Sequence, residues 1–283
     1  DMFDEAGVDV PQTWDEFVEV SEKLQNYFGK EDDDYMAIAL GAKDEWPIYP
    51  LIENMPSGIS GNGQYWNDMA KEDTPFAEGT DINIAYHKIY DFFQTGVFGK
   101  DPLGMGYDQA FSIFMQKGAS MAMDSPIGLT AIKSADVDTS NLEAFYIPFR
   151  ETTEDPLYLP VRGDFLMGIT KNTENYELAK AFVEFYFSDA WYPDYISRLT
   201  SGSTMATVEK ELDPVFESAE KNSPDAEVYT YNGGDAEFQD LVTETRFDYK
   251  KLGAQMFEDG FDLDEALTQL DADWTKAREK LSK

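Results

Sequence analysis

Apolar side chains recur at helical spacing from the start of the chain. In residues 14–28 they stand three or four positions apart at Phe17, Val20 and Leu24, which places them on one face of a helix. Thr13 precedes this stretch and Glu16 follows three positions later, which is the arrangement of a capping box. The pattern therefore predicts an amphipathic helix that begins after Thr13 and ends near Phe28.

The same spacing predicts the other helices. A helix that ends at Gly7 opens the chain, and Gly96 and Gly118 end two later ones. In the helix at 175–187, four residues are expected to face inward, namely Leu178, Ala181, Phe182 and Phe185. The predicted helices cover residues 1–7, 14–28, 46–55, 81–95, 107–117, 127–134, 175–187, 190–200, 207–221, 236–258 and 263–280.

Short apolar runs between the helices predict strands. They lie at residues 35–40, 119–124, 145–149 and 164–170. The glycine-rich stretch 57–68 predicts a loop with a hairpin, because glycine permits positive φ. Strands that alternate with helices and are followed by a helical end indicate an α/β fold.

Composition and charge narrow the class of protein. The 283 residues are 42% hydrophobic and 14% aromatic, enough to build the core of one large or two moderate domains. Acidic residues outnumber basic ones, 56 to 22, and the net charge of −34 repels phosphate and anionic lipid. We therefore expect no binding to nucleic acid or to a membrane surface. The acidic excess is interpreted as a solvated surface that keeps the protein soluble, with adaptation to high salt as an alternative.

The reactive side chains argue against catalysis. The chain has no cysteine, which excludes disulfides and zinc–thiolate sites, and its single histidine, His87, cannot form a His-rich metal site. No nucleophile elbow, P-loop or dinucleotide-binding fingerprint is present. Acidic pairs such as Asp44–Glu45 arise by chance among so many carboxylates. We predict no catalytic residue, no metal site and no cofactor.

Four segments carry a more specific signal. FDEAGVDVPQTWDEFVEVSEKL joins a helix end, a Gly, a Pro and a Thr-Trp helix start, and AFSIFMQKGASMAMDSPIG joins a helix, a glycine turn and a strand. PVRGDFLMGITKNTENYELAKAFVEFYF joins a strand to a long helix, and DLDEALTQLDADWTKAREKL is a final helix. Together and in this order they resemble the sugar-binding, maltodextrin-binding-like family of bacterial extracellular solute-binding proteins of ABC importers. The resemblance covers nearly the whole chain.

The resemblance implies a two-lobed α/β fold of the type II periplasmic-binding-protein class. Residues 1–163 would form the first part of the C-terminal lobe, and 164–210 a segment of the N-terminal lobe with the crossing strand. Residues 211–283 would form the helical end of the C-terminal lobe. The chain opens at Asp1 in a predicted helix. The resemblance implies that most of the N-terminal lobe is missing from it.

The resemblance also implies candidate ligand contacts after the first strands. Asp44, Trp46 and Tyr49 fall where the family places a polar and aromatic wall, although Trp46 could instead anchor its helix in the core. Asp124 and Ser125 fall in a loop where relatives often have an aromatic ring after the proline. This chain has Ile127 there, which puts a maltodextrin-like stacking ring at that loop in doubt.

Further candidates lie near the crossing strand and the last helices. Arg162, Gly163 and Asp164 occupy the crossing, where Arg162 and Asp164 could bind solute hydroxyls or pair with each other. Thr204 matches a loop near the cleft. Arg246 and Phe247 match a region where relatives place an aromatic ring, with packing of Phe247 in the core as the alternative.

The implied function is binding of a solute, expected to be a carbohydrate, by closure of two lobes, followed by delivery to the membrane subunits of an ABC importer. We expect a monomer that is lipid-anchored on a Gram-positive cell surface or else periplasmic. A receptor of the same fold for a polyamine or a peptide is one alternative, since carboxylates beside aromatic rings can hold ammonium groups. A carboxylate-based glycoside hydrolase is another.

Overall fold

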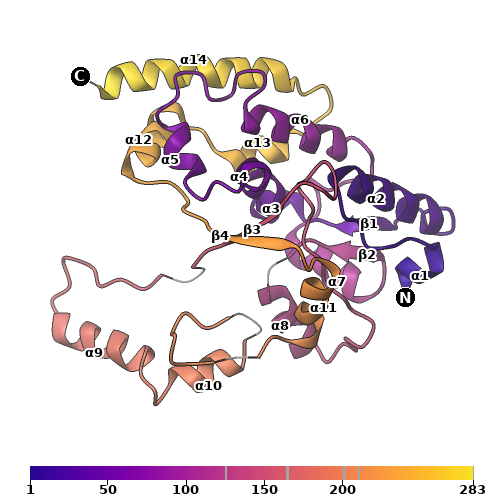
Figure 1. The fold of residues 1–283 in the computed structure, drawn as a ribbon, viewed down its shortest axis with the longest axis horizontal. Helices are drawn as coiled ribbons and strands as arrows, with labels where there is room; N and C mark the ends of the chain where they lie inside the picture. The colour runs from indigo at the N-terminus through magenta and orange to yellow at the C-terminus, as the bar shows by residue number, and fades with distance from the viewer. Residues whose placement is uncertain (125, 164–165, 200–201, 210, 283) are drawn as a thin grey trace. The chain divides into compact units, whose positions relative to one another are not determined.

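The chain divides into two compact units. The computed structural model describes residues 1–124, 126–163, 166–199, 202–209 and 211–282 (Figure 1). The first unit comprises Asp1–Met123, Phe145–Val161 and Asn222–Lys283, and the second comprises Asp124–Ala144 and Arg162–Lys221. The strands and helices together form the predicted α/β fold. The lobe boundaries at residues 163 and 210 stay a prediction.

A short parallel sheet starts the first unit. Strands β1 (Met36–Ala39) and β2 (Ala119–Ala122) pair in register from Met36↔Ala119 to Ala39↔Ala122, which confirms two predicted strands. Helix α2 (Trp14–Phe28) packs against β1, and α7 (Tyr107–Met115) packs against both strands. Every residue of β1 is buried, as its continuous apolar run predicts for a covered strand.

The N-terminus of α2 is capped as predicted by Thr13. The Thr13 hydroxyl accepts a hydrogen bond from the amide of Glu16 at 3.3 Å. The Glu16 carboxylate reaches back to the amide of Gln12 at 2.7 Å, one residue before the cap. Two amides that the helix cannot satisfy are thereby bonded.

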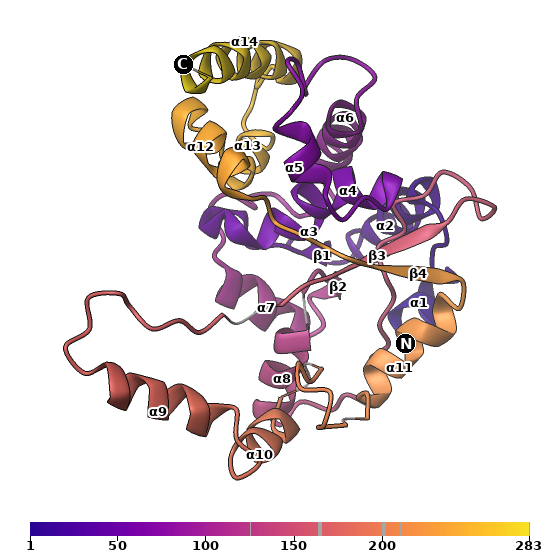
Figure 2. The ribbon, with the colours of Figure 1, turned by 60° about the vertical axis from the view of Figure 1, so that its left-hand side comes forward.

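The other helices of the first unit enclose its aromatic core. Helix α14 (Leu263–Leu281) lies beside α6 (Asp81–Phe93) and α12 (Ala236–Thr245) (Figures 1 and 2). Trp274 of α14 is fully buried, and its ring meets Phe76 edge-on at 5.8 Å. The remaining helical elements are α1 (Met2–Ala6), η1 (Ala42–Asp44), η2 (Trp46–Ile48), α3 (Tyr49–Ile52), α4 (Asn54–Ser60), α5 (Tyr65–Met69) and α13 (Tyr249–Gln255).

A second parallel pair of strands was not predicted from the sequence. β3 (Leu157–Val161) and β4 (Ala226–Thr230) pair from Leu157↔Ala226 to Val161↔Thr230. Pro160 is unfavourable inside a strand, because proline has no amide to donate to a ladder. Most residues of the pair are at least partly exposed, so neither strand carries a buried apolar run. Local pattern therefore contains no signal for this pairing.

The second unit contains four helices within the described residues. They are α8 (Pro126–Ser134), α9 (Tyr176–Tyr186), α10 (Tyr192–Ser197) and α11 (Pro214–Asn222), whose last residue belongs to the first unit. Lys133 pairs with Asp213, and the Ser218 hydroxyl accepts from the amide of Ala144 at 2.8 Å. Tyr192 and Ile196 of α10 are buried. None of the helices in the described ranges combines the length and apolarity needed to cross a bilayer.

Several predicted elements are wrong. Residues 57–68 form no hairpin, and the predicted loop is confined to residues 61–64, where Gly61 has a φ of 65°. The flanking residues belong to α4 and α5, and Gly58 allows close packing, since a Cβ there would lie 2.7 Å from the Phe149 ring. Residues 145–149 and 166–170 form no strand. The helix predicted at 236–258 is broken at Arg246, whose φ of 59° is left-handed. Helices α10 and α11 are shorter than the predicted 190–200 and 207–221.

The predicted inward face of α9 is also wrong. Leu178 is 72%, Phe182 58% and Phe185 52% exposed, and Ala181 is exposed as well. Spacing determines which residues share a face of a helix, but not whether another element covers that face. Among the residues that the structure describes, this face is apolar and open to solvent.

Candidate functional site

The loop after β1 runs directly against the start of α7. A Cβ built on Gly41 would lie 2.5 Å from the carbonyl carbon of Gly106 and 2.6 Å from the Cα of Tyr107. Only a glycine fits such a close approach of two backbones. The amide of Lys43 also donates to the carbonyl of Met105 at 3.1 Å. These contacts fix the course of the loop that carries Asp44 and Trp46.

Asp44 closes the N-terminus of α7 from outside the helix. Its Oδ2 accepts a hydrogen bond from the amide of Tyr107 at 2.7 Å. A carboxylate at this end of a helix is favoured by the unsatisfied amides and by the helix dipole. Asp44 is exposed at the surface, so this structural bond leaves the side chain in contact with solvent.

Glu45 turns the chain sharply before Trp46. Its φ of 58° and ψ of −46° resemble those of a γ-turn, a backbone conformation that residues other than glycine rarely adopt. Holding Glu45 in this conformation costs about 1–3 kcal/mol of folding free energy. The turn separates the two short helices η1 and η2. Strained residues of this kind collect at functional sites. Here the strain precedes an exposed aromatic ring.

Trp46 and Tyr107 form an aromatic surface beside the Asp44 carboxylate. The Trp46 residue is 40% exposed, and its ring centroid lies 4.6 Å from that of Tyr107 at an interplanar angle of 47°. Tyr107 in turn stacks on Phe111 at 5.5 Å and 16°. We call Asp44, Trp46 and Tyr107 the Trp46 platform. Tyr49, at the start of α3 three residues later, is half-buried.

The Trp46 platform combines the groups that bind polyhydroxylated molecules. An exposed indole ring offers an apolar face, on which the C–H face of a sugar can stack. A carboxylate next to it accepts hydrogen bonds from hydroxyl groups. Both are attached to a loop that Gly41 and two hydrogen bonds hold in place. The platform is therefore suited to recognition of a small polar molecule.

A buried polar chain supports the opposite end of α3. The Tyr231 hydroxyl donates to Glu53 Oε1 at 2.9 Å and accepts from the indole N–H of Trp66. Burial raises the pKa of Tyr231 well above its usual value, and the negative Glu53 raises it further. Tyr231 therefore stays a neutral donor at physiological pH and bonds α3 to the segment that follows β4.

Arg246 and Phe247 occupy different environments. Arg246 ends α12 and is exposed. Phe247 is only 4% exposed, and its ring packs edge-on against Phe76 at 5.1 Å and against Trp274 at 6.4 Å. Phe247 therefore packs in the core, which was the predicted alternative to stacking on a ligand.

The remaining predicted residues belong to the second unit. Asp124, Arg162 and Gly163 are exposed. Thr204 is exposed too, and its amide donates to the Tyr192 hydroxyl at 3.0 Å. Ser125 and Asp164 lie outside the described residues, as does the possible pairing of Arg162 with Asp164.

Sequence reasoning did not identify Tyr107. The residue stands 63 positions after Asp44, so only the fold brings the two together. Its position directly after Gly106, at the start of a predicted helix, was the available signal. No group of three or more acidic, histidine or cysteine side chains that could hold a metal was found among the residues the structure describes.

A family model and solved structures both match this chain. A family model described as bacterial extracellular solute-binding protein matches residues 1–193. Among curated protein sequences, none matches the chain. Solved structures do match, as follows.

The manno-oligosaccharide-specific solute binding protein of Bifidobacterium animalis subsp. lactis, solved with mannotriose, superposes with a TM-score of 0.77 at 18% identity, over 99% of this chain and 67% of that one. A chitin oligosaccharide binding protein gives 0.76 at 18% identity, over 98% and 68%. A sugar transporter protein of Bacillus licheniformis in complex with stachyose gives 0.74 at 12% identity, over 98% and 69%. At these identities the likeness shows the fold, and the chain spans about two thirds of each structure.

Proposed function

The chain belongs to the family of bacterial extracellular solute-binding proteins, and from that premise we propose that it is a carbohydrate receptor of an ABC importer. The observation that carries the proposal is the Trp46 platform, where an exposed indole ring lies beside a carboxylate at the carboxyl end of β1. Ligands of open α/β folds bind at this end of the strands. The oligosaccharides bound by the similar solved structures support the same ligand class.

The proposed mechanism is conformational rather than chemical. A sugar ring stacks on Trp46 while Asp44 accepts from its hydroxyls, and residues of the second unit contribute further polar groups. Asp124, Ser125, Arg162, Gly163, Asp164 and Thr204 are the proposed contributors, with Tyr49 and Arg246 on the first unit. Phe247 offers no exposed ring for stacking. The ligand shifts the population toward a closed state because it binds that state more tightly, and no bond of the sugar is broken.

Delivery and location complete the proposal. The closed state is the form that the membrane subunits of the importer recognise. The receptor acts outside the cytoplasmic membrane as a monomer, held by a lipid anchor on a Gram-positive surface or else free in the periplasm. Stimulation of the importer's ATP hydrolysis by the liganded receptor, and not by the empty one, is the measurement that tests delivery.

Calorimetric titration tests the ligand class. The purified chain is titrated separately with mannotriose, a chitin oligosaccharide and stachyose. It is also titrated with spermidine, which represents the alternative class of cationic ligands. At least one saccharide is expected to bind. Replacing Trp46 by alanine is expected to weaken that binding about tenfold to hundredfold, or about 1.4–2.8 kcal/mol, as for a central aromatic contact. Tyr27→Ala is the matched control, since Tyr27 is 45% exposed on α2, away from the platform.

Three results would contradict the proposal. Binding of spermidine without any saccharide would identify a receptor for cations. Release of cleaved sugar over many turnovers would identify a hydrolase. Equal loss of affinity in Trp46→Ala and Tyr27→Ala would remove the platform from the binding site.

A further inference from the structure

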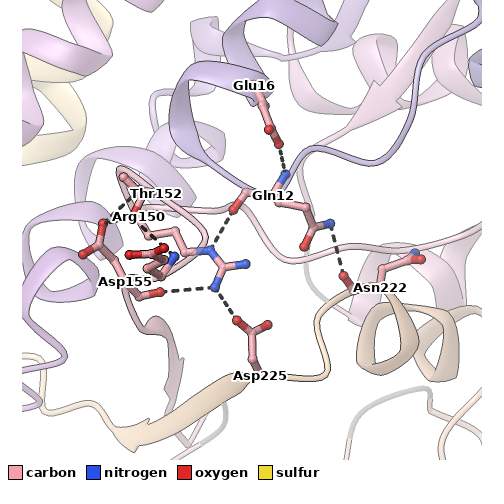
Figure 3. A network of polar contacts seen from close by, with 8 residues as sticks. Gln12, Glu16, Arg150, Thr152, Asp155, Asn222 and Asp225 are labelled. Carbon is pink, nitrogen blue, oxygen red and sulfur yellow. Dashed lines mark hydrogen bonds and ion pairs between the residues drawn. The ribbon is translucent and has the colours of Figure 1, made fainter.

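A buried arginine joins three separate parts of the first unit. The Arg150 side chain is 2% exposed, and its Nε donates to the carbonyl of Gln12 at 2.7 Å (Figure 3). Its Nη1 donates to the carbonyl of Asp155 at 3.2 Å and to the carboxylate of Asp225. The Arg150 carbonyl accepts from the amide of Trp14 at 3.0 Å. One residue therefore bonds the start of α2, the segment before β3 and the segment before β4.

Neighbouring side chains reinforce the same junction. The Gln12 side-chain amide donates to the carbonyl of Asn222 at 3.2 Å. The amide and the hydroxyl of Thr152 both donate to Asp155 Oδ2, at 2.9 Å and 2.8 Å. The hydrogen bond from the Arg150 guanidinium lowers the pKa of Asp225, which favours the charged form of this carboxylate. We call Gln12, Arg150, Asp155 and Asp225 the Arg150 clamp (Figure 3).

The clamp holds the segments through which the chain passes between the two units. The chain enters the first unit at Phe145, leaves it after Val161 and returns at Asn222. Arg150 and Asp155 lie on the first of these stretches, and Asp225 lies at the start of the second. The chain crosses between the two units four times. Three of these crossings, at Phe145, Val161 and Asn222, lie within a few residues of the clamp or of β3 and β4.

Those strands need support from outside. β3 and β4 form a two-stranded ribbon, and such a ribbon is marginally stable alone. The clamp bonds Asp155 and Asp225 just before the first pair of the ribbon, Leu157↔Ala226. At the other end, the amide of Tyr231 donates to the carbonyl of Val161 at 2.9 Å, and the Tyr231 hydroxyl donates to Glu53. The ribbon is therefore held at both ends.

Stability alone does not account for a charge at this position. Burying a guanidinium carries a large desolvation cost, and an apolar side chain of similar size is often as stable or more so. What the arginine provides is geometry, because it donates in fixed directions to three acceptors on three segments. A methionine could fill the space but could not define the register of β3 against β4.

We propose that Arg150 is a positioning residue, which fixes the register and rigidity of the β3–β4 ribbon and so sets the hinge for closure. The ligand part of this inference rests on the proposed function. A loose hinge must be ordered when the ligand closes the protein, and that ordering reduces affinity. Arg150 thereby favours binding without touching the ligand.

Hydrogen exchange and titration test the inference in Arg150→Met and Arg150→Lys. In Arg150→Met, amides of residues 157–161 and 226–230 are expected to exchange about tenfold faster, while those of α6 stay unchanged. Affinity for the saccharide that the wild type binds is expected to fall about tenfold, with Arg150→Lys in between. Arg278→Met is the matched control, since Arg278 of α14 bonds Asp73 and the Ala70 carbonyl, away from the ribbon.

The outcomes separate this inference from the proposed function. Unchanged exchange of the ribbon in Arg150→Met, or equal acceleration in Arg278→Met, would overturn the inference. Accelerated exchange with unaltered affinity would overturn the hinge role. If Arg150→Met does not fold, Asp225→Asn removes only the ion pair. Exchange of residues 157–161 and 226–230 is then expected to accelerate about threefold, as for the loss of one partly exposed contact. No acceleration there would refute the clamp. If the wild type binds no saccharide, the proposed function fails while ribbon exchange still decides the clamp.

Discussion

Replacing Gly41 by alanine tests how the loop of the Trp46 platform is built. The φ of Gly41 is −93°, which alanine can adopt, so any loss of stability has to come from space. The added Cβ would lie 2.5 Å from the Gly106 carbonyl carbon and 2.6 Å from the Tyr107 Cα. Carbon atoms pack best at about 3.5–4.0 Å, so one of the two backbones has to move by about 1 Å.

That movement has a calculable cost. Overpacking of this kind costs about 1–3 kcal/mol. The displaced loop also weakens the bond from the Tyr107 amide to Asp44 and the bond from the Lys43 amide to Met105, which adds about 1 kcal/mol. We expect Gly41→Ala to lower the free energy of unfolding by about 2–4 kcal/mol. Saccharide affinity should fall as well, because Asp44 and Trp46 move with the loop.

Urea unfolding followed by tryptophan fluorescence measures the effect. Gly168→Ala is the control, since a Cβ at Gly168 meets nothing within 4 Å. Its free energy of unfolding should stay within about 0.5 kcal/mol of the wild type. If Gly41→Ala is as stable as Gly168→Ala, the close approach of the loop to α7 is refuted, and so is the argument that Gly41 positions the platform.

Three further substitutions probe buried and paired polar groups. The Tyr86 hydroxyl is buried without a hydrogen-bond partner among the described residues, so Tyr86→Phe should be neutral or stabilising by up to about 1 kcal/mol in urea unfolding. Tyr231→Phe, which breaks bonds to Glu53 and Trp66, should cost about 1–3 kcal/mol, and a similar cost for Tyr86→Phe would contradict the assignment. The Asp225 pKa is lowered in the folded state, so its contribution is present above the unfolded pKa and is lost as pH falls through the folded one. The melting temperature should therefore fall more steeply below pH 4 in the wild type than in Asp225→Asn. If the melting temperatures of the two proteins fall in parallel with pH, the ion pair contributes nothing to stability.

The helices show how far local pattern reaches. The helix predicted at 14–28 and the one predicted at 263–280 match α2 and α14 to within a residue, because periodicity and caps are local properties. The strands β3 and β4 were not predictable in this way, since their residues are mostly exposed and Pro160 interrupts one of them. Gly58 misled the prediction for residues 57–68, because it serves the packing of α4 on Phe149 and not a turn.

The candidate site was partly within reach of the sequence. Asp44 and Trp46 were named, and the structure brings both to Tyr107. Phe247 shows the limit of alignment, since a ring at the expected position is buried in the core. Arg150 carried no signal, because two of its three acceptors lie more than 70 positions away along the chain.

The sequence by itself determined the most strongly patterned helices, such as α2 and α14, together with the α/β class, the absence of cysteine chemistry and the family. These follow from composition, from periodicity over a few turns and from the order of four segments, all of which are readable without contacts. Only the tertiary structure decided that Tyr107 completes the Trp46 platform, that β3 and β4 pair, and that Arg150 holds them. Each of these joins residues far apart in the chain, and such contacts are selected by packing and hydrogen bonding of the whole fold rather than by any local preference.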